Sequence, residues 1–270
     1  VLDYGGEDVA TDVLVQPDGK VVVASVGGAT RAWRITRLNS DGSPDAGFAS
    51  GGTAVVPFGE SVIFVPVAAA LGASGEIVVV GTFDNGVEAG LDVAVLRLLA
   101  NGQPDTSFGP NGVRAIDLGE SELATGVSVD PPGDITVAAA SNGRTALTRL
   151  TDTGTPDPEF NGGAPLVIDV PTLPRGGDLA RLSGGRLLVV IEGSAAGDTS
   201  DIVLARVTPE GALDTSFSDD GIASHDLGGD ERPGRAAIQT DGKIVVAALA
   251  GATELFSIVR FTAGGALDTD

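Results

Sequence analysis

Apolar residues occur along this chain in short runs, and most runs follow a turn-forming segment that contains glycine. Val21-Val22-Val23 follows Pro17-Asp18-Gly19-Lys20, and Ile77-Val78-Val79-Val80 follows a turn at Gly75. Glycine readily takes the positive φ that a tight hairpin turn needs. Continuous β-branched runs are typical of strands that are buried on both faces. The pattern therefore predicts β-hairpins whose second strand lies in the interior of the protein.

This hairpin recurs five times along the chain. Its turn glycines are Gly19, Gly75, Gly133, Gly185 and Gly242, spaced by 56, 58, 52 and 57 residues. Pro131-Pro132 in the third copy replaces the Pro-Asp or Thr-Asp pair of the first and fifth copies. Self-similarity at such a period indicates a repeat architecture in which each copy is one supersecondary unit.

A stricter motif, Arg-x4-Gly-x2-Asp-x2-Phe, follows each hairpin. Its arginines are Arg37, Arg97, Arg149, Arg206 and Arg260, and its aspartates are Asp45, Asp105, Asp157, Asp214 and Asp268. The chain ends at Asp270, before a fifth phenylalanine would appear. Each arginine stands within an apolar strand, where a charge needs a partner, and the aspartate can return to it beyond the glycine turn. We expect these five pairs to be structural.

One repeat reads as strand, turn, strand, loop, strand, turn, Asp/Phe corner and strand. Four antiparallel strands in about 55 residues are typical of a propeller blade, and a solenoid of hairpins is the competing architecture. The last repeat lacks its fourth strand, whereas residues 1–5 resemble the fourth strands of the other repeats. We therefore predict an all-β, five-bladed β-propeller of four-stranded antiparallel blades. We expect residues 1–5 to close the ring by pairing into the last blade, which removes the exposed sheet edges.

We expect residues 1–270 to form a single β-propeller domain. The expected blades are residues 6–59, 60–119, 120–171, 172–228, and 229–270 together with 1–5. Methionine is absent, even at position 1. The chain is therefore expected to be part of a larger protein.

The net charge of −21 comes from 16 basic and 37 acidic residues. This sign repels phosphate backbones and anionic lipids, so we expect no nucleic-acid partner. The longest nearly apolar run, Val62–Leu71, is too short to span a bilayer, so no membrane insertion is expected. With no cysteine and a single histidine, neither a cysteine nucleophile nor a His-rich zinc site can form. We assign no catalytic residue.

Three residues that could suggest chemistry have simpler interpretations. His225 takes the strand position held elsewhere by Val56 and Ile116, so we interpret it as a strand residue. Trp33 alternates with Ile35 in a strand and is expected to pack between blades. The segment 39–42 resembles the start of a calcium loop but lacks the distant glutamate, so we expect a turn.

Three segments resemble the delta-60 repeat family: DGKIVVAA at 241–248, RLNSDGSPD at 37–45 and LDTSF at 213–217. The resemblance covers all five units. It implies a predicted β-propeller of a bacterial secreted or cell-surface protein, often embedded in a larger chain, and it implies no particular chemistry. The expected localisation, extracellular or cell surface, rests on this resemblance, because no signal peptide is visible in the segment. Pro57 departs from the aspartate of the other fourth strands.

The repeats differ in length mainly between their second and third strands, at about residues 26–31, 83–91, 140–144, 193–200 and 249–253. In a propeller these loops share a face with the start of each innermost strand, and variable loops on a rigid scaffold often bind ligands. The candidate binding residues on this face are Asp12, Glu122, Asp178, Arg175, Arg232, Arg235, Asp84, Asp92, Asp198 and Asp201. The face is mostly acidic, and a solvated rim of charges is the simpler alternative.

The sequence favours a non-catalytic binding or scaffolding module whose partner is an unknown protein, glycan or small molecule. An alternative is a structural or adhesion propeller that binds calcium or another hard cation through its acidic residues; calcium is the one cofactor that the sequence leaves open. A second alternative is a glycoside hydrolase, in which Asp12, Glu122 and Asp178 would supply carboxylates at the channel mouth.

Overall fold

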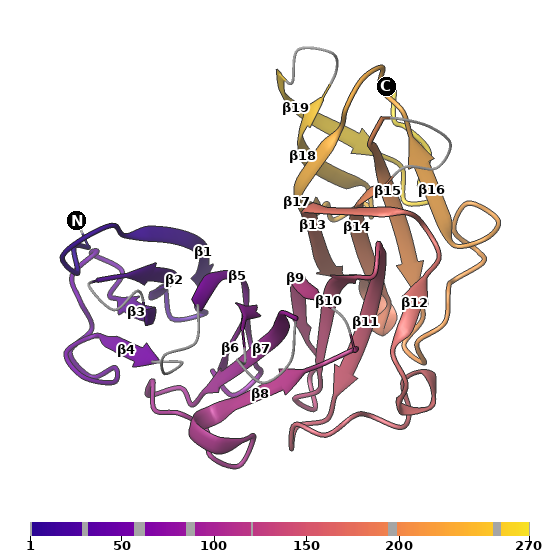
Figure 1. Ribbon diagram of the computed structural model, residues 1–270. Coiled ribbons are helices and arrows are strands. Elements are labelled where there is room, and N and C mark those ends of the chain that lie inside the picture. The colour runs from indigo at the N-terminus through magenta and orange to yellow at the C-terminus, as the bar shows by residue number, and fades with distance from the viewer. Residues whose placement is uncertain are drawn as a thin grey trace. The chain divides into compact units, whose positions relative to one another are not determined.

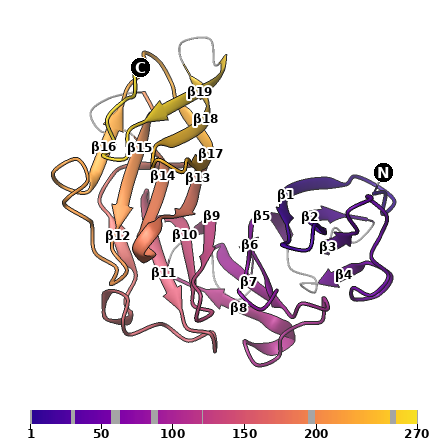
Figure 2. The same cartoon turned by 180° about the vertical axis from the view of Figure 1, so that it is seen from behind.

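The computed structural model describes residues 2–28, 32–56, 63–84, 90–119, 121–193, 199–250 and 255–269. Its strands form five antiparallel sheets, which Figure 1 shows in chain order and Figure 2 shows from behind. The predicted five-bladed, all-β propeller of antiparallel blades is thus confirmed. In the described residues, no helix has the length and apolar character needed to cross a bilayer.

Each blade has its strands in sequential order. The first blade contains β1 (Val9–Val15), β2 (Val21–Gly27), β3 (Ala32–Leu38) and β4 (Thr53–Val56), and the second contains β5 (Ile63–Leu71), β6 (Ile77–Phe83), β7 (Asp92–Leu98) and β8 (Val113–Ile116). The third contains β9 (Glu122–Val129), β10 (Ile135–Ser141), β11 (Arg144–Leu150) and β12 (Leu166–Ile168). The fourth contains β13 (Thr172–Arg181), β14 (Leu187–Gly193), β15 (Asp201–Val207) and β16 (Ile222–His225), and the fifth contains β17 (Arg232–Ile238), β18 (Ile244–Ala250) and β19 (Leu255–Phe261). Within the described residues, short 3-10 turns at Pro110–Gly112, Asn161–Gly163 and Ser183–Gly185 lie between strands.

Two compact units make up the chain. One comprises Val1–Ile135 with Leu150–Thr155, and the other comprises Thr136–Arg149 with Pro156–Asp270. In the first unit, Trp33 and Ile35 of β3 are fully buried against residues of β6 and β7. In the second, residues of β14 and β15 pack against β18 and Phe261. The expected role of Trp33 in packing between blades is therefore confirmed.

The predicted hairpins form at the glycine turns. In the first blade, Val15 pairs with Val21, the amide of Gln16 donates to the Lys20 carbonyl at 2.8 Å, and Gly19 has a φ of +82°. In the second blade, all four residues of Ile77–Val80 are fully buried, as the continuous apolar run predicts. The strand bounds separate the second and third strands of each blade at the segments of variable length, of which residues 29–31, 85–89, 194–198 and 251–254 lie outside the described residues.

Two further sequence predictions are confirmed locally. His225 pairs with Ile202 in the register that Val56 has with Trp33, and so it occupies an ordinary strand position. Its Nε2 lies 2.7 Å from the carbonyl oxygen of Gly265. Residues 39–42 form a turn, in which the amide of Gly42 donates to the Asn39 carbonyl at 2.9 Å.

The N-terminal segment carries no strand within residues 2–8, and the fifth sheet has three strands in the described part of the chain. Tyr4 lies against the first blade: its hydroxyl is 2.5 Å from Thr36 Oγ1, and the Arg34 guanidinium stacks over its ring at 4.7 Å. Ring closure by residues 1–5 stays a prediction.

The Arg-x4-Gly-x2-Asp-x2-Phe motif folds into one repeated corner. The arginine Nε donates to the aspartate Oδ2 in all five blades, at 2.7, 2.8, 2.5, 2.8 and 2.6 Å from Arg37 to Arg260. In the first four blades the guanidinium also stacks over the ring of the motif's phenylalanine, at 4.6 to 4.9 Å. These contacts place a partly buried charge between a carboxylate and an aromatic face, which compensates its loss of water.

Candidate metal centres

Two groups of three carboxylates stand out among the described residues. They are Asp92, Asp117 and Glu122 in the first unit, and Asp201, Asp226 and Glu231 in the second. Within each group, one oxygen of every side chain lies within 4.8 Å of the others. We call these groups the first and the second carboxylate triad.

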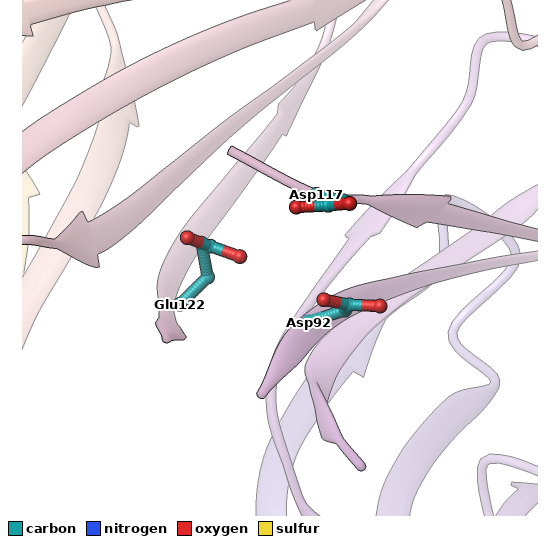
Figure 3. Close-up of side chains that lie close together, drawn as sticks. All are labelled: Asp92, Asp117 and Glu122. Atoms are coloured by element: carbon teal, nitrogen blue, oxygen red, sulfur yellow. The ribbon is translucent and has the colours of Figure 1, made fainter. Parts of the chain in front are cut away.

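Strand register brings the two aspartates of each triad together. Asp92 begins β7, and Asp117 directly follows β8; the pairing of Val93 with Ile116 places the two side by side. Likewise, Ile202 pairs with His225, which places Asp201 beside Asp226. In Figure 3 the carboxylates of Asp92 and Asp117 lie close to each other, and Glu122 faces them from β9 of the next blade.

The main chain fixes the glutamate in the same way at both triads. The amide of Glu122 donates to the Leu91 carbonyl at 2.6 Å, and the amide of Glu231 donates to the Ser200 carbonyl at 2.8 Å. These carbonyls belong to the residues that directly precede Asp92 and Asp201. The aspartates after β8 and β16 each accept the amide of the glycine two residues on, at 2.7 Å in both cases. Two copies of one geometry are thus built from segments 109 residues apart in the sequence.

Because each triad is largely buried, its negative charges repel one another strongly. Glu122 and Glu231 are fully buried, Asp92 and Asp201 are nearly so, and the third carboxylate of each triad is exposed. At an effective dielectric constant of about 20, two unit charges about 4 Å apart repel by about 4 kcal/mol. Calcium binds carboxylate oxygens at about 2.3–2.6 Å, so oxygens of one site lie within about 5 Å of each other. The triads therefore fit a hard divalent cation in charge, donor type and spacing.

The corresponding positions of two other blades are filled differently. Five residues before the motif arginine, the position of Asp92 and Asp201 is Ala32 in the first blade and Arg144 in the third. Arg144 Nε donates to Asp169 Oδ1 at 2.7 Å, and Asp169 corresponds to Asp117. In the third blade the chain itself thus supplies the positive charge beside this aspartate.

Three of the predicted binding residues, Asp92, Glu122 and Asp201, belong to the triads. Asp12 and Asp178 lie elsewhere, at the irregular inner strands of the first and fourth blades. Asp12 Oδ2 accepts the amide of Ala69 at 2.7 Å, and Asp178 Oδ2 accepts the amide of Ala236 at 2.8 Å. Each therefore links an inner strand to the inner strand of the next blade.

The other predicted binding residues have separate places. Arg235 is exposed and donates to Asp178 Oδ1 at 3.1 Å. Arg232 begins β17 and Asp84 follows β6, and both are half-buried. The side chain of Arg175 and the whole of Asp198 lie outside what the structure describes.

Asp117, Asp226 and Glu231 are not among the binding residues predicted from the sequence. Asp117 and Asp226 hold a strand position that is an aspartate in several blades, so this position alone does not single them out. A signal was present, however: wherever an aspartate stands five residues before the motif arginine, a glutamate follows the strand aspartate by five residues. This correlation occurs in the second and fourth blades and separates the triads from the scaffold.

One protein family matches the chain, with the description "Domain of unknown function (DUF5122) beta-propeller". The matched residues are 16–48, 72–108, 185–217 and 239–270, which together make up half of the chain. No curated protein sequence matches it.

Solved structures resemble the chain in fold. A puromycin hydrolase mutant complexed with PGG is 17% identical with a TM-score of 0.55; the match covers all of this chain but only 38% of the hydrolase. A protein of unknown function from Dyadobacter fermentans is 16% identical with a TM-score of 0.55, and the match covers 92% of this chain and 74% of that one. The calcium-binding protein regucalcin from Agrobacterium tumefaciens is 13% identical with a TM-score of 0.48, covering 97% and 73% of the two chains. At these identities the likeness concerns the fold alone.

Proposed function

Since the chain belongs to the DUF5122 beta-propeller family, the delta-60 repeat-like propellers, we propose that it is a non-catalytic binding or scaffolding module of a secreted or cell-surface protein. The different places of repeated and unrepeated residues support this proposal. Residues that recur in every blade are used in turns, corners and buried strands, whereas length differences gather in the loops between the second and third strands. Variable loops on a rigid scaffold are the usual place for ligand contacts.

We further propose that the module binds a hard divalent cation, with calcium as the best fit, at each carboxylate triad. The repetition of the triad in two blades is the observation that carries this proposal. Carboxylate oxygens are preferred ligands of calcium, and water or main-chain carbonyls can complete the six to eight ligands it takes. In each triad the two aspartates belong to one blade and the glutamate to the next. A bound cation would therefore fasten neighbouring blades to each other.

Thermal unfolding in a chelator and in calcium tests this role. We expect the melting temperature to rise when CaCl₂ replaces EDTA, since a ligand at 100 times its Kd stabilises the native state by about 2.7 kcal/mol per site. MgCl₂ should raise it less, because magnesium demands near-octahedral geometry and keeps its waters. A double variant, Glu122→Gln and Glu231→Gln, should melt at one temperature in both media. Equal melting of the unchanged protein in EDTA and CaCl₂ would contradict the cation role and leave the scaffold proposal standing.

The glycoside hydrolase alternative would need Asp12, Glu122 and Asp178 as its acids. Asp12 and Asp178 each accept a main-chain amide of the next blade, and Glu122 faces two aspartates across the first triad. These contacts favour structural and cation-binding roles for the three carboxylates.

A further inference from the structure

A cavity of about 160 Å³ lies within the first unit, between the turn of the β5–β6 hairpin and the turn of the β9–β10 hairpin. Its polar lining includes Glu76, Arg97, Asp105 and Asp152, and Pro131 and Pro132 add apolar surface. Three acidic residues and one arginine thus line the cavity. The cavity lies at the hairpin turns, whereas Glu122 of the first triad stands at the opposite end of β9.

In the first and fifth blades the equivalent place is occupied by a lysine of the protein itself, whereas the third blade has Asp134 at this position. In the first blade, Lys20 follows the hairpin glycine, and its Nζ lies 2.8 Å from Asp45 Oδ2. In the fifth blade, Lys243 takes the same position, and its Nζ lies 2.8 Å from Asp268 Oδ2. In both cases the oxygen that accepts the ammonium also accepts the Nε of the motif arginine. The corner is therefore built to take a second cationic donor.

The second blade lacks this internal donor. Glu76 replaces the lysine, and its Oε2 turns back to accept the amide of Ser74 at 3.0 Å. Asp105 Oδ2 keeps its pair with Arg97 at 2.7 Å, while Asp105 Oδ1 accepts the Ser107 hydroxyl at 2.6 Å. Asp105 Oδ2 thus has no lysine partner and instead lies against two nitrogens of Arg97, Nε at 2.8 Å and NH2 at 2.7 Å.

The motif arginine of the second blade, Arg97, also differs from those of other blades in its hydrogen bonds. Arg37, Arg149 and Arg206 each donate an NH1 hydrogen bond to a carbonyl of the following blade, at 2.5, 2.7 and 3.2 Å. In the part of the chain that the structure describes, Arg97 makes no such bond and instead contacts Asp105 and Ser107. The cavity thus lies where the second blade has neither a lysine nor an arginine bond to the following blade.

We propose that this cavity is a binding site for an alkylammonium group, which takes the place that Lys20 and Lys243 fill in their own blades. The ammonium donates to Asp105 Oδ2 and is held by the negative charges of Glu76 and Asp152, while its alkyl stem contacts Pro131 and Pro132. The group can come from a lysine side chain of a partner or from a free amine, since both present the same chemistry. This site does not depend on cations at the triads.

The test is a titration of the ¹⁵N-labelled chain with n-butylammonium chloride in EDTA, followed by ¹H–¹⁵N spectra. We expect saturable shifts centred on the amides of Ser74, Gly75 and Gly133. Glu76→Lys should weaken binding at least about tenfold, because the introduced side chain occupies the site as Lys20 does in the first blade. Glu159→Lys, which makes the same charge change at an exposed position, should leave binding unchanged.

Two further ligands test which chemical group the cavity recognises. Tetramethylammonium has the same charge but no N–H donor, and it should produce no saturable shifts at these amides. N-acetyl-lysine methylamide represents a protein side chain: binding as tight as that of n-butylammonium assigns the site to a partner's lysine, and weaker binding assigns it to free amines. Absence of saturable shifts with n-butylammonium, or equal affinity in the Glu76→Lys variant, would overturn the proposal.

Discussion

At the scale of single residues, the motif arginine makes several contacts at once. It lies in a strand, pairs with an aspartate eight residues later and stacks on a phenylalanine three residues beyond that. In the third blade, the side chains of Arg149 and Asp157 are only 9% and 7% exposed. Removing one partner of such a pair leaves a buried charge without compensation.

We therefore expect Arg149→Ala to lower the free energy of unfolding by about 3 kcal/mol or more. Arg144→Ala is the matched control on the same strand, because Arg144 and its partner Asp169 are 40% and 88% exposed. An exposed pair of this kind contributes about 0–1 kcal/mol. Urea denaturation measures both variants; similar losses for the two would show that the motif pairs are not structural.

The corner aspartates also predict how stability depends on pH. Hydrogen bonds from Lys20, the Gly47 amide and Arg37 lower the pKa of Asp45 from 3.8 to about 2. The Ser216 hydroxyl and amide together with Arg206 lower the pKa of Asp214 to about 2, despite an opposing effect of burial. Because these pKa values are lower in the folded state, their stabilisation is present above pH 3.8 and is lost as pH falls toward 2.

We expect the melting temperature to fall between about pH 4 and pH 2 through these groups. In Lys20→Ala, the pKa of Asp45 should rise toward 3.8, so its share of the loss begins at a higher pH. Carboxyl NMR titration of Asp45 checks the pKa directly. A titration of Asp45 near 3.8 in the unchanged protein would refute the assigned role of Lys20.

At the scale of elements, the glycine of the repeated motif explains how one blade meets the next. A side chain at Gly102 would place its Cβ 2.7 Å from the ring of Phe48, and one at Gly265 would lie 2.6 Å from the ring of Phe217. In these two cases, and at Gly211 with Phe160, the phenylalanine ring of one blade thus packs directly on the motif glycine of the following blade. The motif fixes both a turn and an interface between sheets.

Comparing Gly42 with Gly102 separates the requirement of the turn from that of the contact between sheets. Both have a φ of +83°, but a Cβ at Gly42 meets no atom within 4 Å. Gly42→Ala should therefore cost only the strain of the left-handed backbone, about 1–2 kcal/mol. Gly102→Ala should cost roughly 1–3 kcal/mol more, since Phe48 must move. Equal losses in urea denaturation would mean that the Phe48 contact does not limit the packing.

Strands and corners could be predicted from the sequence because the five repeats can be compared with one another. A residue found in every blade, such as the arginine at 37, 97 and 149, must serve what every blade needs. Comparing repeats in this way does not find the triads, because Asp117 and Asp226 are themselves repeated residues. They form a triad only in the blades that also contain Asp92 or Asp201. Their proximity depends on the register of β7 with β8 and of β15 with β16, which spacing alone does not give.

At the scale of the whole molecule, both triads join consecutive blades. Each takes two aspartates from one sheet and a glutamate from the start of the next, and each lies within one of the two compact units. Cation binding would thus stabilise both units in the same way. Whether residues 1–5 add a closing strand to the fifth blade remains a separate prediction, drawn from the sequence.

The central claim is that each triad binds one hard divalent cation, and calorimetric titration of CaCl₂ into EDTA-treated, dialysed protein tests it most directly. We expect two ions per chain, and one ion each for Glu122→Gln and Glu231→Gln. Asp169→Asn should still bind two, because Arg144 already supplies the positive charge beside that aspartate. No heat of binding, or a stoichiometry that the two glutamate substitutions leave unchanged, would contradict the claim.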